Sequence, residues 1–426
     1  MRIVHVLTMA LAVALASAAM VAPPATAAAV FELPELSGSA RYQLHYGFIG
    51  GELDWDLAEL RLSLDGELCD WLGYHADLGL DAWSLPAGGV KLMTGEIYAD
   101  AALGPVDLRA GNLVVSWGVA DGINPMNVVN PPRGGGAGGG SPLAAMDAGG
   151  AARRPVPAVE ATYYARDGVS AVTGVLVLDY VPAPLPAGFA SAAEGPVSGG
   201  LLDEVEFAVR AETMLGVYNL YASYFRGRQD LPAAWMDGDV LHLAYRRMHH
   251  VGLAAAGSIG GAAVWAEAGA AIPDAIAELE PGAVGIAPMS SNDVHIQAVV
   301  GAEYTFDVGR GLFTSVQAVY DSSSALFSPY AEAGQEAEAG VYGIAAFRYS
   351  LADDHLLQLV AVADVMNEAV LLMPTYTFAV MPAVELSLSA VAGWASGMAG
   401  GGIPEDGPAA DFARAAGVTA GVKASF

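Results

Sequence analysis

Residues 293–306 read Asp-Val-His-Ile-Gln-Ala-Val-Val-Gly-Ala-Glu-Tyr-Thr-Phe. Taken at every second position, this stretch separates into two sets of side chains. The set from Val294 to Phe306 is apolar, and the set from Asp293 to Thr305 is mostly polar. A helix would mix the two sets, whereas successive side chains of a β-strand point to opposite faces. The stretch therefore predicts a strand with one apolar and one polar face.

The same alternation recurs along the chain, for example at 158–166, 204–212 and 383–394. About eighteen segments show it between clusters of Gly, Pro, Asp and Asn. An even number of antiparallel strands is typical of barrels that span the bacterial outer membrane. The sequence therefore predicts an all-β chain that forms a single transmembrane antiparallel β-barrel. The expected strands are 38–47, 53–64, 70–82, 90–101, 106–117, 156–166, 169–181, 203–214, 217–226, 239–258, 262–271, 293–306, 311–321, 337–349, 355–366, 369–380, 383–394 and 411–426.

Two segments leave the strand count open, at roughly sixteen to twenty. Segment 239–258 is long for a spanning strand of about 9 to 11 residues, so it either projects beyond the membrane or contains two strands. Pro374 lies inside an expected strand, where it would remove a ladder hydrogen bond and need a bulge.

Short and long connections alternate between these strands. After short turns such as Gly104-Pro105, Asp167-Gly168 and Gly260-Gly261, the next connection between strands is much longer. In outer-membrane barrels the short turns face the periplasm and the long loops face outward. We therefore expect residues 28–426 to form the barrel, with the long loops 118–155, 182–202 and 272–292 outside the cell.

The chain begins like an exported protein. Basic Arg2, an apolar run and the small residues around Ala25–Ala27 predict a signal peptide over residues 1–27, with cleavage after Ala27 or, as an alternative, Ala29. Cys69 is the only cysteine, which excludes an intramolecular disulfide framework.

The composition combines strong hydrophobicity with strong acidity. Hydrophobic residues make up 54%, charged residues 15%, the net charge is −28 and the mean hydropathy is +0.42. Beyond the leader no run of about 20 apolar residues is obvious, whereas a barrel hides its apolar face through alternation. Only 18 basic residues are present, which argues against nucleic-acid binding. The expected partners are outer-membrane lipid and a small solute.

The C-terminal segment adds a second sign of a barrel. Phe412, Val418, Ala420, Val422 and Ala424 share one face with the terminal Phe426. A last strand that ends in an aromatic residue resembles the signal by which outer-membrane barrels are recognised for assembly. We therefore expect the barrel-assembly machinery to be a partner through the strand that ends at Phe426.

A motif follows the strand expected at 106–117. Residues 108–125 contain Arg109-Ala-Gly111, Trp117-Gly-Val-Ala-Asp121-Gly-Ile and Asn124-Pro, and Asn130-Pro follows. This Trp-Gly-x-x-Asp-Gly-x-Asn-Pro pattern resembles a signature of uncharacterised bacterial outer-membrane barrels, some of them grouped with alginate-export and porin-like channels. The chain departs from that pattern at Met126, at Asn127 and in the Gly-rich insert 134–140. The motif is either a structural loop that plugs or braces the barrel mouth or an inward-folded constriction that contacts solute.

Sequence signatures of catalysis and of metal binding are weak. His249 and His250 would face opposite sides of a strand, so they cannot jointly bind one metal ion without a bulge. The chain has no Gly-x-Ser-x-Gly elbow, and the insert 134–140 lacks the Lys of a phosphate-binding loop. Glu332, Glu336 and Glu338 are interpreted as a solvated charge run rather than a weak Ca²⁺ site. We expect no enzyme, no cofactor and no metal.

The polar strand faces predict a water-filled lumen. Carboxylates outnumber arginines there, which favours cations, unless neighbouring Glu and Arg residues neutralise one another. The predicted function is a porin-like channel for diffusion or export of a small or linear polar solute. The alternatives are a closed structural or adhesive barrel and a transporter of hydrophobic substrates that uses Trp83, Trp117 and Trp235; an enzyme is more distant. The oligomeric state stays open. The lumen or constriction candidates are Trp117, Asp121, Asn124, Asn130, Arg109, Glu160, Arg166, Glu204, Glu206, Arg210 and Glu303.

Overall fold

A computed structural model describes residues 34–48, 51–85, 88–133, 153–185, 205–238, 240–275, 284–286, 288–323, 326, 338–396 and 416–426. The predicted signal peptide, Glu204, Phe412 and the Gly-rich insert 134–140 lie outside these residues, as do parts of the three expected long loops. Within the described residues, no helix is long and apolar enough to cross a membrane.

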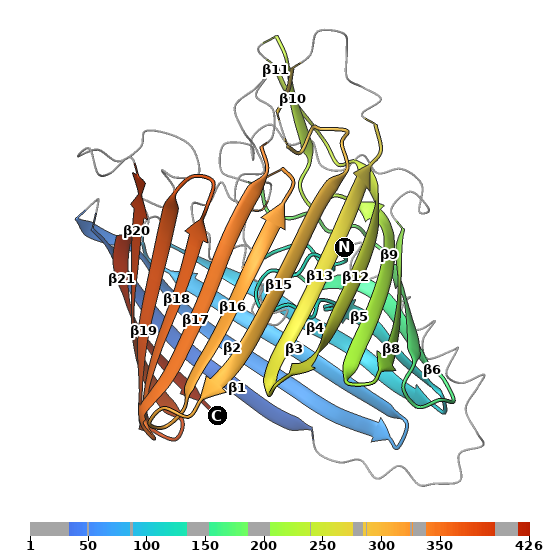
Figure 1. Cartoon of the computed structure of the whole chain (residues 1–426). Coiled ribbons are helices and arrows are strands. Elements are labelled where there is room, and N and C mark those ends of the chain that lie inside the picture. Colours follow the sequence, from blue (N-terminus) through green and yellow to red (C-terminus); the bar gives the residue numbers. More distant parts are fainter. Residues whose placement is uncertain are drawn as a thin grey trace.

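The chain is all-β, and eighteen strands close into one antiparallel barrel, as the alternation predicts. Figure 1 shows the tilted strands following the order of the chain around a ring. The barrel strands are β1 (Glu35–Gly47), β2 (Glu52–Cys69), β3 (Leu72–Trp83), β4 (Gly89–Leu103), β5 (Val106–Leu113), β6 (Val156–Tyr164), β7 (Ala171–Val177), β8 (Glu206–Leu215), β9 (Tyr218–Arg228), β12 (Arg247–Ile259), β13 (Ala262–Pro273), β15 (His295–Phe306), β16 (Leu312–Asp321), β17 (Gly340–Ala352), β18 (His355–Asp364), β19 (Ala369–Met381), β20 (Val384–Ala395) and β21 (Ala416–Ser425).

Pairing of the first and last strands closes the barrel. β1 and β21 are antiparallel, with Ser39 opposite Ser425 and Gly47 opposite Gly417. Two backbone hydrogen bonds between Gly38 and Phe426, of 2.9 and 3.0 Å, complete this seam. Closure pairs both edges, so no exposed sheet edge remains in the wall of the barrel.

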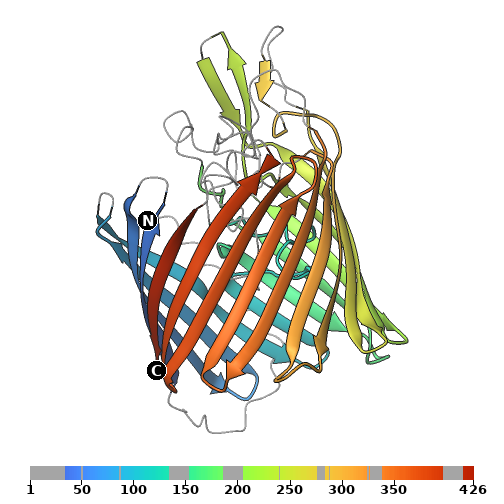
Figure 2. The ribbon, with the colours of Figure 1, turned by 60° about the vertical axis from the view of Figure 1, so that its left-hand side comes forward.

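The short turns lie at the end of the barrel where the chain terminates (Figure 1). The β12–β13 turn is the two-residue hairpin Gly260-Gly261, whose φ values of 59° and 88° suit glycine. The long connections lie at the other end. A separate three-stranded sheet rises there, formed by β10 (Ala233–Asp237), β11 (Val240–Ala244) and β14 (Val284–Ile286). Figure 2 shows this sheet beyond the barrel rim.

The apolar face of each strand points outward. On β15, Ile296 and Val300 are 43% and 58% exposed, whereas Val299 on the other face is 3% exposed. On β8, Phe207 is exposed and Glu206 is buried. An outward apolar band and a polar interior are what a membrane-spanning barrel requires.

Several expected boundaries were wrong. Segment 239–258 contains two strands, which confirms one of its two expected alternatives, because the chain leaves the small sheet after Ala244 and joins the barrel at Arg247. The strands expected at 106–117, 156–166 and 169–181 end at Leu113, Tyr164 and Val177. Pro374 does not require a bulge. The β19–β20 register is the same on both sides of it, at Leu372–Ala392 and at Thr375–Ser389, and only the pairs between these two are missing from the ladder.

Candidate functional site

The connection after β5 folds into the barrel. In both views the teal segment that follows β5 lies inside the ring of strands (Figure 1, Figure 2). We call residues 114–133 the inner loop. Its start is held by side chains instead of a strand ladder, since Val114 N donates to Glu96 Oε1 at 2.8 Å and Val115 N donates to Asn130 Oδ1 at 2.7 Å.

Two asparagines give the inner loop its shape. Asn130 Nδ2 donates to Leu113 O at 2.8 Å and to Arg154 O at 2.9 Å, which joins both ends of the loop. Asn127 Oδ1 accepts from Trp117 N at 2.6 Å and from Gly118 N at 2.9 Å. A Cβ at position 118 would lie 2.2 Å from Asn124 Oδ1, so glycine is required there. These bonds replace the hydrogen bonds that the backbone loses on leaving the wall.

Glu267 of β13 ties the inner loop to a part of the wall that is distant from β5 in the ring of strands. Its carboxylate accepts three backbone N–H groups: Val119 at 2.7 Å and Ala120 at 3.2 Å on Oε2, and Met126 at 2.6 Å on Oε1. The residue is 2% exposed. Gln317 of β16 adds a hydrogen bond from Nε2 to Asp121 O. Because hydrogen bonds to a charged acceptor are the stronger ones, Glu267 is the main polar anchor of the loop.

Apolar side chains of the inner loop pack against two parts of the wall. Ala120 and Ile123 belong to a buried cluster on β13 to β20 that includes Trp265, Val299 and Leu371. Val115, Trp117 and Val129 belong to a second cluster, which is centred on β5 to β12. The loop therefore crosses the lumen between two sides of the barrel.

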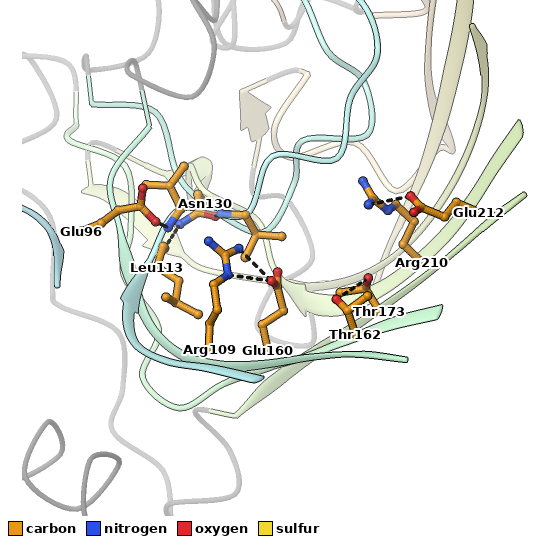
Figure 3. A network of polar contacts seen from close by, with 11 residues as sticks. Glu96, Arg109, Leu113, Asn130, Glu160, Thr162, Thr173, Arg210 and Glu212 are labelled. Atoms are coloured by element: carbon orange, nitrogen blue, oxygen red, sulfur yellow. Dashed lines mark hydrogen bonds and ion pairs between the residues drawn. The ribbon is translucent and has the colours of Figure 1, made fainter. Parts of the chain in front are cut away.

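Ion pairs line the wall beside the inner loop (Figure 3). Arg109 of β5 contacts Glu160 of β6 with Nε–Oε1 and Nη2–Oε1 distances of 2.9 and 2.7 Å. Arg210 of β8 contacts Glu212 at 2.9 Å, and its guanidinium lies 5.7 Å from the centre of the Trp117 ring. Each of these arginines is thus neutralised by a nearby carboxylate.

A second charged group lies on β1 to β3. Arg61 pairs with Glu59 at 2.7 Å and with Asp81, and Arg41 reaches Glu59 at 3.5 Å. His75 lies between two carboxylates, 2.6 Å from Asp65 and 3.2 Å from Asp77. The Asp65 and Asp77 side chains are 54% and 42% exposed. They are the most accessible acids of this group.

The end of the inner loop brings positive charge toward that group. Arg133 donates from Nε to Arg153 O at 2.7 Å, and Arg154 donates from Nη1 to Pro182 O at 2.6 Å. Burial lowers the pKa of Arg133, and the positive charges of Arg61 and Arg154 lower it further, against the opposing effect of Asp81 and Asp77. The described part of the chain gives neither Arg133 nor Arg154 an ion pair.

The predicted site residues fall into distinct places. Trp117, Asn130, Glu160 and Glu206 are buried, and Arg109 and Arg210 are paired on the wall. Asn124 is half-buried, Asp121 is exposed, and Glu303 is half-buried on the inner face of β15. Arg166 lies in the exposed β6–β7 turn and not on a strand face, because β6 ends two residues earlier.

Sequence reasoning missed several residues of this site. Glu267 is the lone charged residue of the Ala- and Gly-rich segment 251–272, which is a visible signal in the sequence, but the alternation alone does not identify it as the loop anchor. Asn127 was noted only as a departure from the motif. Arg133 and Arg154 had no signal in the alternation, because they lie on loops. Trp117 and Trp235 are 3% and 4% exposed, so they present no open indole face to a hydrophobic substrate.

Six buried side-chain atoms have no hydrogen-bond partner among the described residues, and most of them lie at the boundary between the inner loop and the wall. They are Asn124 Oδ1, Arg210 Nε, His250 Nδ1, Trp265 Nε1, Ser315 Oγ and Gln317 Oε1. Buried polar groups normally find a hydrogen-bond partner, so this boundary offers unused donors and acceptors. Among the described residues, no group of three His, Cys, Asp or Glu side chains could hold a metal ion.

Comparisons with known proteins bear on the fold alone. No family model and no curated protein matches the chain, so the alginate-export resemblance stays a prediction. The structure is similar to Acinetobacter baumannii OccAB1, with 8% identity, a TM-score of 0.55, and coverage of 92% of this chain and 95% of that chain. It also matches a mutant of a Rh. blastica porin, with 13% identity, a TM-score of 0.43 and coverage of 92% and 100%. The likeness to OccAB1 thus supports the barrel fold of the chain.

Proposed function

We propose that this chain is an outer-membrane channel through which small polar solutes diffuse. The observation that carries the proposal is the inner loop, which lies inside an eighteen-stranded barrel, packs against two parts of its wall and is anchored by Glu267. A polar lining around a constriction is what a diffusion pore needs. The proposed orientation in the membrane places the long connections outside the cell and the short turns in the periplasm.

Conductance across planar bilayers tests this function. Purified wild-type protein gives discrete conductance steps. Glu267→Ala gives larger or noisier steps, because the inner loop loses the acceptor of three backbone N–H groups. Glu303→Ala is the matched control, since Glu303 is a glutamate on the inner face of the adjacent strand, opposite Ala263, and has no hydrogen bond or ion pair with the described residues of the loop. It leaves the step size close to wild type.

A closed structural or adhesive barrel gives a different result. The same inner loop would then fill the lumen, and neither the wild type nor Glu267→Ala would conduct. Equal steps from Glu267→Ala and Glu303→Ala would show that the loop does not set the width of the pore.

A further inference from the structure

We propose that the lumen holds a binding site for a small zwitterionic solute, between two arginines at the end of the inner loop and the carboxylates of β2 and β3. Arg133 and Arg154 would hold the carboxylate of the solute, and Asp77 would hold its ammonium group. The proposal rests on the proposed channel function, because a solute reaches this site only through an open lumen, and it names the class of solute.

The two arginines extend from a short antiparallel bridge. Pro132, at the end of the inner loop, lies opposite Arg153 in this bridge. Arg154 N donates to Pro131 O at 2.8 Å, and Arg133 Nε donates to Arg153 O at 2.7 Å. These hydrogen bonds tie the two chain segments together, so the backbone from which both guanidinium groups extend is held in place.

The charges of these two arginines are not neutralised within the described part of the chain. The Arg133 side chain donates to Arg153 O, and Arg154 Nη1 donates to Pro182 O at 2.6 Å, so both acceptors are uncharged carbonyl groups. A guanidinium has several N–H donors, and its planar fork matches the two oxygens of a carboxylate. The end of the inner loop therefore offers donors to an anionic group.

The wall of β2 and β3 keeps an excess of negative charge. Asp81 is paired with Arg61, and its side chain is 16% exposed. Asp65 and Asp77 are more exposed and share one imidazole, since His75 Nδ1 lies 2.6 Å from Asp65 and His75 Nε2 lies 3.2 Å from Asp77. Even a protonated His75 neutralises only one of these two carboxylates. At least one negative charge thus stays available to a cationic group.

The opposite charges face one another across a gap. Arg133 lies within electrostatic reach of Asp77 and Asp81, yet no ion pair joins it to either of them. An ion pair requires a nitrogen–oxygen distance of about 4 Å or less, so these charges stand farther apart than that. A solute with one charge of each sign can contact both sides of the gap. Once one end is bound, the other end is held near its partner at a high effective concentration, so a zwitterion should bind more tightly than a solute with a single charge.

Saturation-transfer NMR of the detergent-solubilised full chain tests this site without using conductance. The probes are γ-aminobutyrate, butyrate and butylammonium, and γ-aminobutyrate is expected to bind most tightly. Arg133→Gln, which keeps a side-chain amide that can donate to Arg153 O, weakens γ-aminobutyrate and butyrate by about fivefold, or roughly 1 kcal/mol, and leaves butylammonium unchanged. Asp77→Asn weakens γ-aminobutyrate and butylammonium and leaves butyrate unchanged.

Two matched controls change the same charges elsewhere in the lumen. Arg348→Gln removes a positive charge from the face of β17 that also carries buried Ile344, and Glu303→Gln removes a negative charge from the inner face of β15. Neither control changes the affinity for γ-aminobutyrate.

Equal affinities for the three probes overturn the proposal, because a bridged gap must favour the zwitterion. So does an Arg133→Gln variant that loses all three probes alike, since this would show a general change of the lumen. A protein that binds γ-aminobutyrate as expected but gives no conductance steps refutes the channel alone, whereas a conducting protein that binds none of the probes refutes this site alone.

Discussion

At the scale of single residues, side chains make the hydrogen bonds to the backbone of the inner loop that a neighbouring strand would make in the barrel wall. Asn130 is 1% exposed and makes three hydrogen bonds, to Val115 N, Leu113 O and Arg154 O. Asn130→Ala leaves these buried backbone groups without a hydrogen-bond partner. We therefore expect the free energy of unfolding to fall by about 2 kcal/mol. Urea titration of the folded protein measures the loss.

Asn124→Ala is the matched control for this variant, because the Asn124 Oδ1 atom has no partner in the described part of the chain. The control should be close to wild type. If both asparagine variants unfold at the same urea concentration as wild type, the hydrogen bonds of Asn130 do not stabilise the loop.

The Arg226–Asp274 pair predicts a pH effect at the barrel rim. Hydrogen bonds from Arg226 lower the pKa of Asp274, and the nearby positive charges add to this effect. A depressed pKa in the folded state means that the pair stabilises the protein above the ordinary aspartate pKa and that this is lost as pH falls through the lowered value. Asp274→Asn should therefore lower the thermal midpoint at pH 7, and its difference from wild type should shrink in strong acid. A difference that persists unchanged at pH 2 would contradict the ion pair.

At the scale of elements, Arg246 connects the small sheet to the barrel. It is 6% exposed and donates to Gln229 Oε1 and Asn292 Oδ1 at 3.1 and 3.0 Å, and to Met289 O and Ser291 O at 2.6 and 2.8 Å. Arg246→Gln cannot span all four acceptors. We expect hydrogen exchange in β10, β11 and β14 to accelerate by at least tenfold, while exchange in the barrel strands stays at the wild-type rate.

Arg310→Gln is the control for this measurement, since Arg310 pairs with Asp353 among the short turns at the opposite end. It should leave exchange in the small sheet unchanged. Faster exchange throughout the barrel of Arg246→Gln would instead mean that Arg246 supports the whole fold.

The strands of the barrel were predictable from the sequence, and so was a compact loop after the strand expected at 106–117, whereas the contacts that hold this loop were not. Alternation is a local property, so segments such as 293–306 reveal their strand and its two faces without any partner. The inner loop depends on contacts between distant residues: Val119 and Glu267 are 148 positions apart. β10 and β14 were missed because strands of three to five residues carry too little alternation to detect, whereas β11 lies inside the expected segment 239–258.

At the scale of the whole molecule, the register of the strands decides which side chains face the lumen and which face outward. A shift of one residue would turn every inner acid toward the outer surface. In the barrel, Glu267, Glu160 and Glu206 all lie on the inner face, opposite an outer face of Val, Leu and Ala. The acid-rich sequence is therefore compatible with a membrane-facing surface, and most of its charge on the strands is directed to the lumen.

This distribution predicts that an open pore prefers cations. Ion pairs neutralise Arg109 and Arg210, but Asp65 and Asp77 have exposed side chains and only His75 between them. Accessible carboxylates in a low-dielectric wall raise the local cation concentration. Asp65→Asn with Asp77→Asn should move the reversal potential in a KCl gradient toward zero.

Glu206→Gln is the control for selectivity, because Glu206 is 4% exposed and accepts Arg228 N, so its charge is hardly accessible to passing ions. It should leave the reversal potential unchanged. The preference should also weaken at 1 M salt, where a Debye length of about 3 Å screens the wall charges from the middle of the lumen. A wild-type reversal potential near zero, or of anion-selective sign, would mean that Arg133 and Arg154 at the end of the inner loop outweigh the acids of β2 and β3, and that the constriction and not the wall sets the selectivity.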